Sequence, residues 1–300
     1  MPSLEQQVTD AAPRCAAPDP NPSTPRLKLP AGSCDSHAHI CGPGSQYFYS
    51  PDRIYTPPDA LLPDYLAMLE TLGVERAVII QPSIYGTDNS VTLAAIKQAA
   101  IPCRGVAVID ETISDDEIAA LDQAGIRGIR LNLVDVAGPT GDMPIDIARH
   151  LADRIAPLGW HTEFLVHVDD YPDFDEIFAG FPTHIVLGHL GYMRPNKDIT
   201  HPGFQALLRL MQGGRCWVKL TGPYRISSGD LPYPGVTETA HALIDCAPER
   251  VVWGSDWPHV MVTKPMPNDG DLCDLLADWI PDEDIRRKIL VDNPARLYGL

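Results

Sequence analysis

The sequence has no run of apolar residues that approaches the roughly 18 needed to cross a membrane as a helix. Its first residues show no charged start followed by an apolar stretch, so we expect no secretory signal. Its seven cysteines are scattered and include no C-x-x-C pair, which is typical of reduced thiols rather than of a disulfide framework. These absences predict a cytoplasmic protein that does not bind membranes.

Basic residues are scarce in this chain. Lysine and arginine number 23 against 40 aspartates and glutamates, which gives a net charge of −17. Such a surface repels nucleic acid and anionic membranes, so we expect neither as a partner. A small anionic substrate would need its own local arginine or lysine. At 44% hydrophobic and 21% charged residues, the composition is that of an ordinary globular protein with a sizeable core.

Residues 1–32 lack a periodic apolar pattern and contain seven prolines. We interpret this segment as an extended arm, either loose or laid over the domain surface. From Ser33 onward, short β-branched runs alternate with amphipathic stretches. This rhythm predicts a single catalytic domain over residues 33–300.

Eight of the β-branched runs have the length of buried strands. They are Ser33–Ile40, Arg76–Pro82, Arg104–Asp110, Gly128–Leu133, Trp160–Val168, His184–His189, Cys216–Thr221 and Arg250–Asp256. Helical segments lie between them; one starts with Ser114 and Glu117, which form a capping box. This alternation over about 250 residues predicts an α/β protein of the (β/α)8, or TIM-barrel, class. An open doubly wound sheet is the alternative, but no G-x-G-x-x-G follows the first strand, which disfavours its nucleotide-binding versions.

The expected strand ends carry residues that suit chemistry. The first strand ends in D-S-H-A-H, with His37 and His39, the sixth in His189 and the eighth in Asp256. Residues two apart on a strand point to the same side, and active sites of such barrels lie at the C-terminal strand ends. A lone histidine or aspartate there would more often be a core residue or a helix cap. The four together predict a functional site.

These motifs resemble the amidohydrolase superfamily: D-S-H-A-H, V-L-G-H-L-G around His189, and V-V-W-G-S-D-W-P-H around Asp256. More narrowly, the chain is similar to the 2-pyrone-4,6-dicarboxylate lactonases and their relatives. Supporting motifs are Y-T-P at 55–57, G-T-D-N at 86–89, G-I-R-G-I-R at 125–130 and N-P-A-R-L-Y at 293–298. The resemblance covers residues 30–299 and implies a hydrolase that opens a carboxylated lactone in aromatic-compound degradation.

The resemblance also implies roles for single residues. Asp256 would be the general base that activates water, and His37, His39 and His189 would surround the carbonyl group. The residues that would bind the acidic groups of the substrate are Arg130, Tyr55, Ser83 and Arg225. The chemistry is consistent with these roles, because a carboxylate can take a proton from water, imidazole can stabilise an oxyanion, and arginine pairs with carboxylate.

Two positions depart from the dicarboxylate lactonase pattern. A further basic residue is expected after the fourth strand, where this chain has Asp135 and Val136. An aromatic residue of the fifth strand is replaced near Leu165, and His167 follows. We therefore expect a small anionic lactone whose charges are placed differently, such as a sulfonated or monocarboxylated muconolactone, rather than the 2-pyrone dicarboxylate.

The resemblance leaves the cofactor open. Many superfamily members bind zinc, and here the ligands of one Zn²⁺ would be His37, His39, His189 and Asp256, with His167 as an added candidate. Lactonases of this branch include members that work without metal, and we expect no required cofactor.

Other activities and assemblies stay open as well. The alternative activities are a zinc-dependent decarboxylase of an aromatic or muconic acid, a lactone isomerase, and a barrel that binds an acidic ligand without converting it. The sequence does not define the oligomeric state, and a homo-oligomer is compatible with it.

Overall fold

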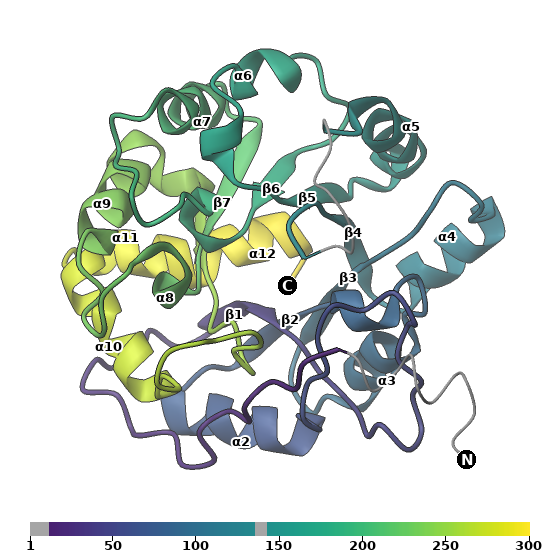
Figure 1. The fold of residues 1–300 in the computed structure, drawn as a ribbon, viewed down its shortest axis with the longest axis horizontal. Coiled ribbons are helices and arrows are strands. Elements are labelled where there is room, and N and C mark those ends of the chain that lie inside the picture. Colours follow the sequence, from purple (N-terminus) through teal and green to yellow (C-terminus); the bar gives the residue numbers. More distant parts are fainter. Residues whose placement is uncertain (1–11, 136–142) are drawn as a thin grey trace.

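The computed structural model describes residues 12–135 and 143–300. Its centre is a sheet of eight parallel strands, hydrogen-bonded in chain order (Figure 1). The strands are β1 (Cys34–Ala38), β2 (Arg76–Ile80), β3 (Cys103–Ala107), β4 (Ile126–Asn132), β5 (His161–Leu165), β6 (Ile185–Leu187), β7 (Cys216–Leu220) and β8 (Val251–Trp253). Parallel neighbours need a crossover connection, and the helical segments after the strands supply it.

Most helices form a ring outside the strands, whereas the last helix of the chain lies near the centre of the view (Figure 1). The helices are α2 (Leu62–Leu72), α3 (Ser90–Gln98), α4 (Asp115–Gln123), α5 (Ile145–Ile155), α6 (Phe174–Ile177), α7 (Pro202–Gln212), α8 (Pro223–Ile226), α9 (Val236–Cys246), α10 (Asp269–Trp279), α11 (Glu283–Arg287) and α12 (Asn293–Tyr298). Because helices cover the outside of the sheet and side chains fill its inside, the strands are almost completely buried. Within the described ranges, none of these helices has the length and apolar character to span a bilayer.

Hydrogen bonds between the ends of β8 and β1 draw the sheet into a barrel. The Asp256 N–H donates to the His37 carbonyl at 2.8 Å, and the His39 N–H donates to the Trp257 carbonyl at 2.8 Å. These bonds also fix the site residues of the two strands relative to each other. At the opposite end of the barrel, Tyr298 of α12 is buried in a cluster with residues of β1, β2 and β3.

The observed architecture confirms the (β/α)8 barrel, and a strand lies within or across each of the eight predicted runs. The capping box at α4 also forms. The Glu117 N–H donates to Ser114 Oγ at 3.2 Å, and the Ser114 N–H donates to Glu117 Oε2 at 2.8 Å. Local side-chain chemistry therefore sets this helix start as the sequence predicts.

Helix α10 is not evident from the sequence, where Pro265, Pro267 and Gly270 are residues typical of loops. The Asn268 side chain caps the helix by accepting from the Gly270 N–H at 3.0 Å. A Cβ atom at position 270 would lie 2.0 Å from the Ser23 carbonyl oxygen. Glycine is needed there because the N-terminal arm passes so closely, which local sequence cannot indicate.

The N-terminal arm lies along the barrel mouth before it reaches α10. The Cys15 N–H donates to the Thr56 carbonyl at 2.9 Å, and the Thr56 N–H donates to the Pro13 carbonyl at 2.8 Å. On its other side, Cys15 Sγ accepts from the Met261 N–H at 3.3 Å. The arm thus joins the segment after β1 to the segment after β8. The first 11 residues of the predicted arm lie outside the described residues.

Candidate active site

The two histidines of the first motif lie at the C-terminal end of the barrel. His37 is in β1 and His39 follows it; both are buried, and their rings meet edge to face with centroids 5.0 Å apart. Nδ1 of His39 lies 2.8 Å from the Ile80 carbonyl oxygen. A carbonyl oxygen only accepts, so this nitrogen carries the hydrogen and Nε2 of His39 presents a lone pair.

Asp256 follows β8, and its two carboxylate oxygens have different surroundings. Oδ2 accepts hydrogen bonds from Arg225 Nε at 2.7 Å and from the Tyr224 hydroxyl at 2.6 Å. Oδ1 has no hydrogen-bond partner among the described residues and lies 3.6 Å from His37 Nε2. The backbone of Asp256 is left-handed, with φ of 66°, a conformation that is uncommon in non-glycine residues. One oxygen is therefore fixed while the other faces the histidines.

Charged neighbours keep the Asp256 carboxyl ionised. Burial by itself would raise its pKa. The Arg225 guanidinium, the neighbouring histidines and the Tyr224 hydrogen bond outweigh burial, so the pKa of Asp256 lies below its usual range. The carboxylate is consequently available as a proton acceptor throughout the neutral pH range.

His189 follows β6 and joins the same group. The Thr221 hydroxyl oxygen accepts a hydrogen bond from the backbone N–H of His189 at 3.0 Å. The same oxygen lies 3.0 Å from Nδ1 of the His189 ring. The His189 ring centroid is 5.4 Å from that of His37, and its Nδ1 is 3.9 Å from Asp256 Oδ2. The fold thus brings together the four residues that the strand ends predicted.

Burial keeps all three imidazoles neutral near pH 7. It lowers the pKa of His39 to about 3, with Arg130 adding to the effect, and it lowers the pKa of His189 to about 3. The pKa of His37 also lies well below its usual value, with burial as the main cause. The site therefore offers neutral hydrogen-bond donors and acceptors rather than imidazolium cations.

Arg130, Tyr55 and Ser83 form a second cluster, which we call the Arg130 side of the mouth. Arg130 is buried on β4, and its Nη1 donates to the Gln81 carbonyl at 3.3 Å. Its Nε has no hydrogen-bond partner in the described part of the chain. Tyr55 is buried and hydrogen-bonded to the Ser83 side chain. A buried guanidinium with unused donors suits a carboxylate or sulfonate ligand.

Arg225, the other arginine assigned to substrate, lies on the opposite side of the mouth. Besides its bond to Asp256, its Nη2 donates to the Val260 carbonyl at 3.0 Å, and it hydrogen-bonds the Tyr192 side chain. A pocket of about 300 Å³ is lined in part by Arg225 and Tyr224. Much of the hydrogen-bonding capacity of Arg225 is thus used within the protein, and its direct contact is with Asp256.

Sequence reasoning missed a polar chain behind Asp256. The Tyr224 hydroxyl that donates to Asp256 also lies 2.9 Å from His259 Nδ1. His259 Nε2 in turn lies 3.1 Å from Asp269 Oδ1, and all three partners are buried. The available signal is the W-P-H that follows Asp256 in the sequence.

A buried ion pair behind His37 was also missed. Lys219 of β7 and Glu163 of β5 lie inside the barrel with Nζ and Oε2 2.6 Å apart. Lys219 Nζ is also 3.2 Å from His37 Nδ1. The signal in the sequence was a charged residue at an interior position of each strand. Barrel strands rarely contain a charged interior residue unless it has a partner.

His167 does not join the histidine cluster. It follows β5, its Nδ1 lies 2.6 Å from the Tyr192 carbonyl oxygen, and its ring packs on the Tyr192 ring with centroids 4.5 Å apart. Nδ1 must donate to that carbonyl, so the Tyr192 backbone orients this ring. Its position gives no support for His167 as an added metal ligand.

The donor atoms of His37, His39 and Asp256 lie within 4.8 Å of one another. Two imidazoles and a carboxylate are the ligand types that Zn²⁺ prefers, and the unpartnered Asp256 Oδ1 and His37 Nε2 fit an ion in type and spacing. His189 is not part of this group in the described residues. Two of the three ligands already contact a cation, because Asp256 binds Arg225 and Lys219 reaches His37.

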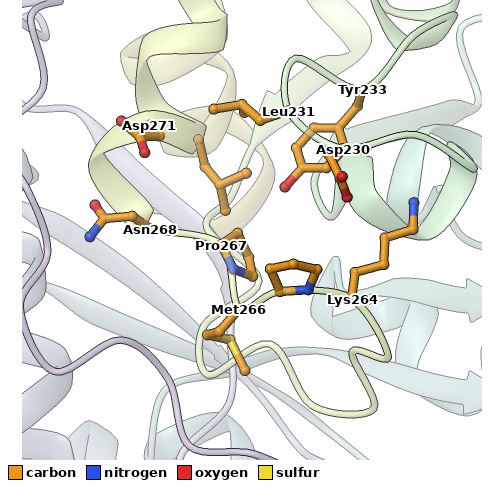
Figure 2. Close-up of a pocket in the computed structure, with 10 residues that line it drawn as sticks. Asp230, Leu231, Tyr233, Lys264, Met266, Pro267, Asn268 and Asp271 are labelled. Atoms are coloured by element: carbon orange, nitrogen blue, oxygen red, sulfur yellow. The ribbon is translucent and has the colours of Figure 1, made fainter.

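A separate surface pocket of about 320 Å³ is lined by residues of 230–233 and 264–272 (Figure 2). Lys264 borders this pocket, and its amine donates to the Gly229 carbonyl at 2.7 Å. The histidine cluster does not contribute to its lining. The same lysine also lines the pocket that contains Arg225 and Tyr224.

Comparisons with known proteins identify the family of this chain. The model of the family described as amidohydrolase matches residues 34–300. The 4-sulfomuconolactone hydrolase of Hydrogenophaga intermedia is 35% identical, with 99% of this chain and 98% of that protein covered. The 2-pyrone-4,6-dicarboxylate hydrolase of Comamonas testosteroni is 36% identical, with 93% of each covered.

Among solved structures, a putative 2-pyrone-4,6-dicarboxylic acid hydrolase of Pseudomonas putida superimposes with a TM-score of 0.76. It is 32% identical, and the alignment covers 90% of this chain and 98% of that chain. The matched region contains every strand of the barrel and all four residues of the buried cluster. From the full-length matches and the shared barrel, the chain belongs to the amidohydrolase family of enzymes.

Proposed function

We propose that this enzyme hydrolyses a small lactone that carries an acidic group, in the degradation of aromatic compounds. The observation that carries this proposal is the asymmetry of Asp256. Arg225 and Tyr224 hold Oδ2, while Oδ1 is left without a partner in the described residues and faces the histidine cluster. A carboxylate arranged in this way can orient a water molecule and take its proton through one defined oxygen.

The reaction follows from these positions. Oδ1 of Asp256 takes a proton from water as the water oxygen bonds to the lactone carbonyl carbon. Negative charge then develops on the carbonyl oxygen, where neutral imidazole donors of the cluster stabilise it. The bond between the carbonyl carbon and the ring oxygen breaks next, and the proton held by Asp256 returns to the product. On the Arg130 side, the guanidinium binds the acidic group and so orients the ring.

The substrate we propose is a sulfonated or monocarboxylated muconolactone rather than the 2-pyrone dicarboxylate. The relatives carry names for both substrate types, so sequence similarity does not separate them. Asp135 lies close enough to act on the pKa of Tyr55, which places an acidic side chain beside the Arg130 side. A second substrate carboxylate pointing there would meet a like charge. Val136, the other departing position, lies outside the described residues.

We propose that no metal is required. The support is that Asp256 is already paired with Arg225, and that a lysine amine lies against His37. The alternative is one Zn²⁺ held by His37, His39 and Asp256, which would polarise the carbonyl as a Lewis acid. Metal analysis of the purified protein, followed by assay after chelation, tests this. Unchanged kcat in metal-free protein supports the proposal, and loss of activity that Zn²⁺ restores contradicts it.

The proposed partner is a small anionic molecule, and the proposed location is the cytoplasm. All seven cysteines are free thiols, which agrees with a reducing compartment. The net charge of −17 disfavours nucleic acid. A homo-oligomer is compatible with the sequence, and its presence is to be tested by measuring the oligomeric state in solution.

The direct test mixes the enzyme with a set of lactone acids and follows absorbance and proton release. Hydrolysis consumes water, releases an acid and changes the conjugated chromophore. A decarboxylase would release CO₂ instead, an isomerase would convert the ring without net acid release, and a binding protein would give no turnover. Any of these last three results, with no hydrolysis of any lactone acid, contradicts the proposed function.

A further inference from the structure

The Lys219–Glu163 ion pair is unusual because it is completely enclosed by the barrel. The exposed fraction of the lysine side chain is 0% and that of the glutamate is 2%. Removing both charges from water costs several kcal/mol per ion, and replacing such a pair by apolar residues is often neutral or stabilising. Stability therefore gives no sufficient reason for a charged pair at this place, which lies directly behind His37.

The contacts of the lysine amine account for its three hydrogens. Nζ lies 2.6 Å from Glu163 Oε2, 3.0 Å from the Ser36 carbonyl oxygen and 3.2 Å from His37 Nδ1. The carbonyl and the carboxylate only accept. Glu163 Oε1 also lies near His37 Nδ1, at 3.5 Å, but the lysine amine is closer. An ammonium group has three hydrogens and no lone pair, so its third hydrogen points to His37 Nδ1, which then accepts it.

The acceptor role of Nδ1 determines the tautomer of His37. A neutral imidazole carries one hydrogen, and with Nδ1 accepting, that hydrogen is on Nε2. Nε2 faces the site, has no partner among the described residues and lies 3.6 Å from Asp256 Oδ1. His39 has the opposite arrangement, because its Nδ1 donates to the Ile80 carbonyl and its Nε2 presents a lone pair.

We propose that Lys219, held by Glu163, is a positioning residue that fixes His37 as the Nε2–H tautomer, so that the H-x-H motif presents one hydrogen-bond donor and one acceptor to the reacting lactone. The carbonyl oxygen is the group that needs a donor as negative charge develops on it, and this part rests on the proposed function. With the other tautomer, Nε2 of His37 would direct a lone pair at that oxygen. Loss of a single oxyanion donor costs about 10²–10³ in kcat in other enzymes.

The first experiment reads the tautomer directly and needs no substrate. The full-length protein is labelled with ¹⁵N-histidine, and the ring nitrogens are observed by long-range ¹H–¹⁵N NMR at neutral pH. His37→Gln and His39→Gln variants assign the signals by their loss. We expect a protonated, pyrrole-like Nε2 for His37 and a protonated Nδ1 for His39. A protonated Nδ1 on His37 overturns the proposal, because the lysine would then be a neutral acceptor.

The second experiment removes the pair without leaving an unpaired charge. The double variant Lys219→Met with Glu163→Gln is expected to lower kcat about 10²–10³-fold with little change in KM, because ground-state binding on the Arg130 side is intact. Its NMR spectrum is expected to show His37 no longer confined to the Nε2–H form. Arg209→Met with Asp175→Asn, which removes a surface ion pair of 2.7 Å, is the matched control and leaves both readouts unchanged.

The outcomes separate this proposal from the proposed function. A folded double variant with wild-type kcat and an unchanged His37 tautomer overturns the positioning role. If the double variant does not fold, the wild-type NMR spectrum still decides the tautomer. If the enzyme hydrolyses no lactone acid, the proposed function fails, whereas the assignment of hydrogens on His37 and His39 stands or falls by NMR alone.

Discussion

The two sides of the barrel mouth each contain an arginine, buried in the case of Arg130 and partly buried in the case of Arg225, and the two differ in how many of their donors the protein already uses. Arg225 bonds to Asp256, to a backbone carbonyl and to a tyrosine side chain. Arg130 makes one bond of 3.3 Å to a carbonyl, and its Nε has no partner in the described ranges. A satisfied arginine orients its neighbours, while an unsatisfied one in a buried site is left for a ligand. We therefore propose that Arg130 binds the substrate and that Arg225, which was expected to bind it as well, acts mainly by orienting Asp256.

The largest effect is expected at Asp256, which accepts hydrogen bonds from Arg225 and Tyr224. Asp256→Asn keeps the shape of the side chain but removes its charge, and general-base removal lowers kcat about 10²–10⁴-fold. Steady-state kinetics measures the loss, and circular dichroism with thermal melting checks the fold. A folded variant that keeps more than about a tenth of wild-type kcat would show that another group takes the proton.

The next effect tests the Arg130 side. Arg130→Met is expected to lower kcat/KM about 10²-fold for an acidic lactone and far less for a neutral one, because a charge-assisted contact is lost. Arg127→Met is the matched control on the same strand, since Arg127 bonds to Asp122 and to nearby backbone instead. Equal losses on charged and neutral lactones would argue that Arg130 has no part in binding the acidic group.

A smaller effect is expected from the acidic residue beside the Arg130 side. The wild-type enzyme is expected to prefer a monoacidic lactone over the 2-pyrone dicarboxylate, and Asp135→Asn is expected to narrow the preference by about tenfold, because a like charge is removed. Parallel kcat/KM measurements at equal pH and salt check this. A wild-type enzyme that favours the dicarboxylate by tenfold or more refutes the substrate choice.

The smallest effect near pH 7 concerns the Arg225 side. The pKa of Asp256 is held below its usual value, so the carboxylate stays ionised as pH falls and the wild-type kcat/KM profile is flat from neutral pH to about pH 5. Arg225→Met removes the main cause of that lowering, and burial then raises the pKa. The acidic limb of the kcat/KM profile of this variant is therefore expected to lie about one pH unit or more above that of the wild-type enzyme. An unmoved limb would mean that Arg225 does not control this carboxyl.

The strand ends allowed the barrel and the four central residues to be predicted, because a period of two and the position after an apolar run are local properties. The positions of His37, His39, His189 and Asp256 follow from the fold once eight strands are counted. The hydrogen-bond partner of Arg225 could not be predicted, since an arginine just after a strand has many acceptors within reach. Local sequence shows only that a residue lies near the mouth.

The Lys219–Glu163 pair shows a second limit. These residues are 56 positions apart on β5 and β7, and only the closed barrel places their side chains together. Sequence alone indicates a charged residue in each apolar strand and leaves its partner undefined. Helix α10 was missed for a related reason, because its glycine is explained by the arm residue Ser23, which is remote in the chain.

The contact of the arm with Thr56 and Met261 has a consequence for how substrate range can change. Barrel enzymes usually acquire new specificity through the loops that connect strands to helices. Here residues 13–15, which precede the first strand, lie against the residue that follows Tyr55. Libraries that vary only this short segment would alter the rim beside the Arg130 side while leaving every strand, helix and connecting loop of the barrel in its present sequence. New specificity could then be selected without exposing the folding core to mutation.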